Sequence, residues 1–151
     1  MIECACCTEN YSKMVQISYY ENICPKCAYI NLSKIKETIN LKGKVALITG
    51  AREGLGYETT LKLLRCGAKV IGTTRFPYIA WYNYAHEHDY DEWKHKLTVY
   101  GCNFVNPMNV NNMLTYVKKF PLDIVINTAC SMYSLDPHHI KSSVGFQRYL
   151  A

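Results

Sequence analysis

The stretch of sequence that decides the fold is Val45-Ala46-Leu47-Ile48-Thr49-Gly50-Ala51-Arg52-Glu53-Gly54-Leu55-Gly56. Its first five residues, 45–49, form an apolar run with the length of a buried strand, which stops at a glycine. The leucines Leu55, Leu61 and Leu64 follow at helical spacing and predict a helix over 55–65, which Gly67 ends. A strand, a glycine-rich turn and a helix in this order indicate the start of a β-α-β unit.

The alternation of strands and helices continues along the chain. Further strands are expected at 69–74, 97–102 and 122–128. Between them, an aromatic-rich segment predicts a helix in two pieces over 78–96, and Asn109 is expected to cap a helix that runs to Lys118. This order indicates the α/β class, as a partial doubly wound parallel sheet of the Rossmann type with strand order 3-2-1-4. A ligand crevice is then expected where the carboxyl ends of the strands meet.

The motif Thr-Gly-x-x-x-Gly-x-Gly at 49–56, with Leu-Lys-Gly-Lys-Val-Ala-Leu-Ile before it, resembles the opening of the short-chain dehydrogenase/reductases. The resemblance covers residues 41 to about 130. Asn127-Thr128-Ala129-Cys130 is similar to the family's Asn-Asn-Ala-Gly segment, with Thr128 and Cys130 as departures. Asn103 and Phe104 occupy the place where the family usually has an Asp and an apolar residue beside the adenine. The glycines suit a pyrophosphate, since they allow close approach of backbone amides. The cofactor-binding residues that this resemblance implies are Gly50, Arg52, Gly54, Leu55, Gly56, Thr74, Arg75, Asn103, Phe104, Asn127 and Ala129.

The end of the second strand bears on the choice of cofactor. Members of the family that prefer NAD place an acidic residue there to hold the ribose 2′-hydroxyl. Here Thr74 and Arg75 offer a hydroxyl and a guanidinium, which suit a 2′-phosphate. We therefore expect NADP in preference to NAD; the alternative is that Arg75 is a solvated loop arginine.

Five of the eight cysteines fall within the first 27 residues. Two C-x-x-C pairs, Cys4 with Cys7 and Cys24 with Cys27, are separated by sixteen residues, which suits a hairpin with a strand near 14–20. These four thiolates predict one structural zinc; Cys6 could replace Cys4 or Cys7, and free or redox thiols are the alternative. Cys24 to Cys27, together with Thr-Thr-Arg-Phe-Pro at 73–77, also resembles a eukaryotic subset of the family that carries a C-P-x-C knuckle before the reductase domain. The expected organisation is a zinc-binding ribbon at 1–30, a connector at 31–43, the dinucleotide-binding half at 44–130 and an irregular tail at 131–151.

The family's chemistry needs a Ser and a Tyr-x-x-x-Lys from a fifth strand and the helix after it, which residues 1–151 do not reach. Ser142 and Ser143 lie in the tail with no Tyr at the needed offset. Tyr90 and Lys94 have the right spacing, but they lie before Asn127, so we interpret them as a coincidence on a polar helix face. No catalytic residue is assigned. The leading hypothesis is an NADP(H)-binding oxidoreductase that resembles this family and lacks the catalytic Ser-Tyr-Lys, either through gene truncation or because the remaining half is on a second chain. A non-catalytic zinc-ribbon and nucleotide-binding scaffold or sensor is the alternative, and a zinc ribbon that contacts nucleic acid is a weaker one.

The composition excludes several classes of protein. The chain has 151 residues, 49% of them hydrophobic, and no apolar run of membrane-spanning length. Its net charge of +5 is mild and scattered, so nucleic acid is not an expected partner. The start of the chain lacks the pattern of a signal peptide, which makes the cytoplasm the expected location. The fourth strand would be an unpaired edge, where a second protein chain could pair.

Overall fold

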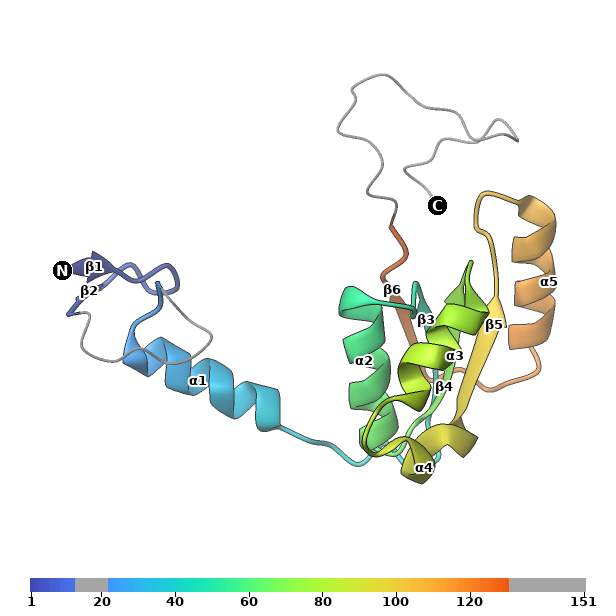
Figure 1. Cartoon of the computed structure of the whole chain (residues 1–151), viewed down its shortest axis with the longest axis horizontal. Coiled ribbons are helices and arrows are strands. Elements are labelled where there is room, and N and C mark those ends of the chain that lie inside the picture. Colours follow the sequence, from blue (N-terminus) through green and yellow to red (C-terminus); the bar gives the residue numbers. More distant parts are fainter. Residues whose placement is uncertain (13–21, 131–151) are drawn as a thin grey trace, which may run out of the picture. The chain divides into compact units, whose positions relative to one another are not determined.

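The computed structural model describes residues 1–12 and 22–130, in two compact units, Met1–Ile39 and Asn40–Ala151 (Figure 1). The strand predicted near 14–20 and the tail predicted at 131–151 lie outside the described residues. Within the described ranges, no helix combines the length and the apolar character that crossing a lipid bilayer would require.

The second unit contains a parallel four-stranded sheet. Its strands are β3 (Val45–Thr49), β4 (Lys69–Thr74), β5 (Leu97–Gly101) and β6 (Ile124–Asn127). They lie in the order β5-β4-β3-β6, which confirms the predicted order 3-2-1-4. All five residues of β3 are buried, as a strand with neighbours on both edges and layers on both faces requires.

Helices cover both faces of this sheet (Figure 1). The helical segments are α2 (Gly54–Arg65), α3 (Pro77–Ala85), α4 (Tyr90–Trp93), a 3-10 turn at Lys94–Lys96, and α5 (Pro107–Val117). Leu61 and Leu64 of α2 share one apolar cluster with Tyr84 of α3, while Met113 and Val117 of α5 belong to a second cluster. The structure thus has the α/β fold of a partial Rossmann domain.

Two details of the helices differ from the sequence prediction. Asn106, not Asn109, caps α5: its side-chain oxygen accepts a hydrogen bond from the backbone of Met108 at 3.0 Å. An asparagine directly before Pro107 makes the stronger start, because proline is preorganised for the first helical position. Leu55 does not join the buried leucines of α2; its side chain is 73% exposed in the first turn.

The described residues of the first unit, 1–12 and 22–39, form a short antiparallel pair and one helix. Strands β1 (Ile2–Glu3) and β2 (Asn10–Tyr11) flank the first cysteine pair. Helix α1 (Pro25–Lys36) begins inside the second pair, with the proline in its first turn. The helix crosses residue 30 and ends within the predicted connector at 31–43.

Candidate functional site

Three glycines shape the turn between β3 and α2, and each has its own physical reason. Gly50 and Gly54 have φ angles of 76° and 57°, in the left-handed region that favours glycine. A Cβ on Gly56 would lie 2.3 Å from the carbonyl oxygen of Gly50, so only glycine fits there. The backbone N–H groups of Gly50 and Ala51 both donate to Thr73 O, at 2.9 and 3.0 Å. This fastens the turn to the end of β4.

The turn leaves the start of α2 open at the carboxyl edge of the sheet. No side chain caps this helix at Glu53, and the side chain of Leu55 is exposed. The first N–H groups of a helix lack partners within it and carry partial positive charge, which suits an anion. Because the strands are parallel, Arg75, Asn103 and Asn127 follow or end their strands at this same edge.

Thr49 joins the ends of β3 and β6. Its hydroxyl donates to Asn127 Oδ1 and accepts hydrogen bonds from the backbone N–H groups of Thr128 and Ala129, both at 3.2 Å. The Thr128 hydroxyl donates in turn to Thr49 O at 2.5 Å. Thr128, a departure from the family's pattern, therefore fastens two strands; sequence reasoning missed the roles of both threonines.

Two arginines meet one aromatic ring beyond the end of β4. The guanidinium carbon of Arg52 lies 5.0 Å from the centre of the Phe76 ring, and that of Arg75 lies 5.5 Å from it. Arg52 also forms an ion pair with Glu53. Thr74, the last residue of β4, is buried, and its hydroxyl accepts the backbone N–H of Phe76 at 3.1 Å.

In the loop after β5, the predicted cofactor-binding residues Asn103 and Phe104 also stabilise the fold. Asn103 Oδ1 accepts the N–H of Val105 at 3.2 Å, and the backbone N–H of Asn103 donates to Asn109 Oδ1 at 3.4 Å. Phe104 packs against the apolar cluster under α5. Asn103 thus lies at the expected edge, while Phe104 contributes to the core.

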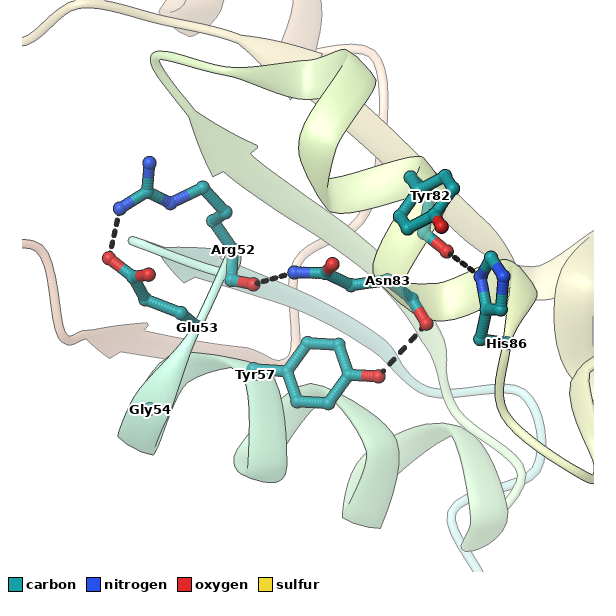
Figure 2. A pocket seen from close by; sticks show the side chains of 7 residues that line it. All are labelled: Arg52, Glu53, Gly54, Tyr57, Tyr82, Asn83 and His86. Atoms are coloured by element: carbon teal, nitrogen blue, oxygen red, sulfur yellow. Dashed lines mark hydrogen bonds and ion pairs between the residues drawn. The ribbon is translucent and has the colours of Figure 1, made fainter.

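Helix α3 anchors the glycine-rich turn from the side. The Tyr84 hydroxyl donates to Ala51 O at 2.6 Å, and Asn83 Nδ2 donates to Arg52 O at 3.3 Å. Burial raises the pKa of Tyr84, so its hydroxyl stays a donor. A pocket of about 360 Å³ lies between α2 and α3. Figure 2 shows Arg52 at one end of it and the side chains of Tyr82 and His86 at the other. The aromatic-rich sequence of α3 was the only signal for these anchors.

Tyr90 and Lys94 stand apart from this edge. They lie directly before β5, which places them at the amino end of the strands, opposite the glycine-rich turn. The Tyr90 ring packs edge-on against Trp93, and Lys94 pairs with Asp91 at 2.6 Å. Tyr90 therefore supports the core, so the prediction of a polar helix face was wrong for this residue.

Four cysteine side chains converge in the first unit: Cys4, Cys7, Cys24 and Cys27, whose sulfurs all lie within 4.8 Å of one another. The sulfurs of Cys7 and Cys24 are 3.8 Å apart. The backbone N–H of Cys24 donates to the Cys4 sulfur at 3.2 Å, and this hydrogen bond is the largest of several that together lower the Cys4 pKa to about 6. The side chain of Cys6 is exposed and lies outside the group of four.

Glu87, His88 and Asp89 form a second group of potential ligands, whose two carboxylates are already engaged in other interactions. Arg65 donates to Asp89 at 2.7 and 2.9 Å and to Glu87 at 2.9 Å. The Tyr57 hydroxyl donates to the other oxygen of Glu87 at 2.6 Å. These carboxylates thus join α2 to the segment after α3 as ion-pair partners.

Comparisons with known proteins agree with this architecture, although no protein-family model matches the chain. An uncharacterized protein of Acanthamoeba polyphaga mimivirus is 35% identical over 133 residues, which cover 83% of this chain and 28% of that protein. An uncharacterized oxidoreductase of Schizosaccharomyces pombe is 52% identical over 46 residues, or 28% of this chain and 14% of its own length. The 3-oxoacyl-(acyl-carrier-protein) reductase FabG of Pseudomonas aeruginosa is 57% identical over 35 residues, or 23% of this chain and 14% of its own length.

A structure of a Tyr-to-Phe variant of ElxO with NADPH bound superposes with a TM-score of 0.53 at 24% identity; the match covers 68% of this chain and 41% of that one. It shows the shared fold. The chain spans less than a third of the length of each curated relative above.

Proposed function

We propose that the second unit is the NADP(H)-binding half of an oxidoreductase of the short-chain dehydrogenase/reductase type. The observation that supports the proposal is that Arg52, in the turn before the uncapped start of α2, and Arg75, after the end of β4, both lie against the Phe76 ring. The helix start suits a pyrophosphate, and the arginines suit a 2′-phosphate. No acidic residue ends β4, where an NAD-binding site would place one.

The remaining predicted residues would complete the nucleotide site. Gly50, Gly54 and Gly56 would let backbone amides approach the pyrophosphate, with Leu55 covering it. Asn103, at the end of β5, would contact the adenine beside Phe104, and Thr74 would shape the loop around the 2′-phosphate. Asn127 and Ala129 would border the nicotinamide side.

Calorimetry with NADPH and NADH tests this proposal. Since a hydrogen bond to a charged group contributes about 1.5–3 kcal/mol, wild-type protein should bind NADPH about tenfold or more tightly than NADH. Arg75→Asp should abolish or reverse that preference. Lys118→Asp makes the same charge change at the end of α5 and should leave the preference intact. Equal binding of both nucleotides by wild-type protein would contradict the proposal.

Turnover of a carbonyl substrate requires catalytic residues in addition to those that bind the cofactor. Reduction of a carbonyl by hydride leaves an alkoxide that an acid must protonate. No tyrosine followed by lysine four residues later occurs after Asn127 within residues 1–151. We therefore propose that residues 1–151 bind the nucleotide and do not by themselves turn over a carbonyl substrate. Oxidation of NADPH by this purified polypeptide with aldehydes or ketones, lost in Gly54→Asp, would contradict this and would also exclude the scaffold alternative.

We further propose that the first unit holds one structural zinc through Cys4, Cys7, Cys24 and Cys27. Four sulfurs about 2.3 Å from a central zinc lie about 3.8 Å from one another in a tetrahedron. The observed separation of 3.8 Å between Cys7 and Cys24 matches that edge. The backbone N–H donors on the Cys4 sulfur would stabilise a thiolate ligand.

Zinc content measured on protein purified without added metal tests this site. Wild-type protein should carry one zinc per chain, and Cys7→Ser should lose it. Cys6→Ser is the matched control, because this exposed cysteine lies in the same knuckle outside the group of four. Metal-free wild-type protein with a folded first unit would contradict the proposal.

The open edge of strand β6 supports a proposal about a protein partner. Among the described residues, β6 is hydrogen-bonded to one neighbour, β3, and its outer edge is open. An unpaired edge can accept another strand, so we propose that a second protein segment pairs there. Sedimentation of wild-type protein over a range of concentrations should reveal association, and Val125→Lys, at an exposed position of β6, should weaken it.

A further inference from the structure

Phe76 contacts two cations that come from different segments of the chain. Arg52 lies in the turn after β3, and Arg75 lies in the loop after β4. Both guanidinium carbons are within about 6 Å of the ring centre, the range in which an aromatic face attracts a cation. Two like charges near one another would repel, so a shared ring offsets part of the cost of bringing them together.

The backbone holds Phe76 in place although its side chain is 44% exposed. Its N–H donates to the hydroxyl of the buried Thr74, and its carbonyl oxygen accepts the N–H of Ala80 at 3.2 Å in the first turn of α3. The residue after Phe76 is Pro77, whose ring fixes the backbone at the first position of α3. The ring is thus attached to β4 and α3, while the arginines that contact it are on flexible side chains.

We infer that Phe76 is a positioning residue for recognition of the 2′-phosphate, an inference that rests on the proposed NADP(H) binding. Its ring keeps the guanidinium groups of Arg52 and Arg75 beside the carboxyl end of β4. Side chains held in the bound arrangement lose less conformational entropy when the ligand arrives. A phosphate bound there accepts charge-assisted hydrogen bonds from both, and Arg52 exchanges its ion pair with Glu53 for the phosphate.

The test compares binding of 2′,5′-ADP and 5′-AMP, which differ only in the 2′-phosphate and need no nicotinamide site. Wild-type protein should bind 2′,5′-ADP about tenfold or more tightly. Phe76→Leu keeps an apolar side chain but removes the aromatic face, and should reduce that ratio about two- to fivefold without changing the 5′-AMP affinity. Phe76→Tyr keeps the aromatic face and should bind the two probes with the wild-type ratio. Tyr78→Leu is the matched control, because Tyr78 is an 83% exposed aromatic residue in the first turn of α3, and it should leave the ratio unchanged.

The outcomes separate this inference from the function on which it rests. Equal binding of the two probes by wild-type protein, or binding of neither, would overturn the proposed NADP(H) preference and the role of Phe76 with it. A wild-type preference that Phe76→Leu retains in full would overturn the role of Phe76 alone. The same holds if Phe76→Leu weakens both probes equally, since that pattern indicates a general effect on the fold.

Discussion

The hydroxyl of Thr128 donates a 2.5 Å hydrogen bond to the carbonyl oxygen of Thr49, which joins two parallel strands at the residues where the proposed crevice begins. The two residues are 79 positions apart in the sequence. The Thr128 hydroxyl also lies where a Cβ on Gly56 would meet it at 2.5 Å. One threonine thus links β3, β6 and the start of α2.

Thr128→Val should destabilise the second unit by about 1 kcal/mol, because it removes one hydrogen bond at almost constant shape. Urea unfolding followed by tryptophan fluorescence would measure this, since both tryptophans, Trp81 and Trp93, lie in that unit. Thr128→Ser keeps the hydroxyl and should unfold close to wild type. An unchanged midpoint for the valine variant would show that the bond does not contribute.

Substitution of Gly54 or Gly56 by alanine should reduce the stability of the second unit by unequal amounts. Gly54→Ala meets no atom within 4 Å and costs only the strain of a positive φ, about 1 kcal/mol. Gly56→Ala would push against the carbonyl of Gly50 and should cost about 3 kcal/mol, with loss of nucleotide binding. Thermal unfolding and calorimetry would test the order of the two effects, which the opposite ranking would contradict.

Acid should weaken the link between α2 and the segment after α3. The Arg65 guanidinium beside Asp89 holds the pKa of that carboxyl well below its usual value of 3.8. The folded pKa is the lower one, so the ion pair stabilises the fold above about pH 4 and loses this contribution as pH falls toward the folded value. Asp89→Asn should therefore be less stable than wild type at neutral pH, with a difference that shrinks in acid.

Asp91→Asn is the control for this pH dependence. Asp91 also pairs with a cation, Lys94, but its side chain is 87% exposed. An exposed pair of this kind contributes little, so the stability of this variant should follow wild type from neutral to acid pH. A constant difference between Asp89→Asn and wild type across that range would contradict the linkage.

Removal of metal should affect the first unit selectively. Among the residues described in this unit, the buried ones are Cys4, Cys24, Cys27 and Ala28, so closure of the proposed zinc site should provide most of its folding free energy. A strong chelator should abolish the protease resistance of helix α1 and leave the tryptophan fluorescence of the second unit unchanged. Restored zinc should reverse the effect; an α1 equally protected with and without chelator would contradict it.

The sequence by itself determined the parts of this protein that depend on local physics. The apolar run at 45–49, stopped by a glycine, predicted the buried strand β3, and the glycines after it predicted the turn in which Gly50 and Gly54 have positive φ angles. Strand order followed from the alternation of strands and helices and from the rules of crossover connections. The spacing of the cysteines likewise predicted the group of four sulfurs that the structure brings together.

The tertiary structure alone decided which side chains meet. The bonds from Thr128 to Thr49 and from Tyr84 to Ala51 join residues 79 and 33 positions apart, and no local pattern specifies such pairs. The shared contact of Arg52 and Arg75 with Phe76 arises because parallel strands bring two turns to one edge of the sheet. Periodicity and spacing act over a few residues, whereas these contacts depend on how whole elements pack, so only the folded chain could reveal them.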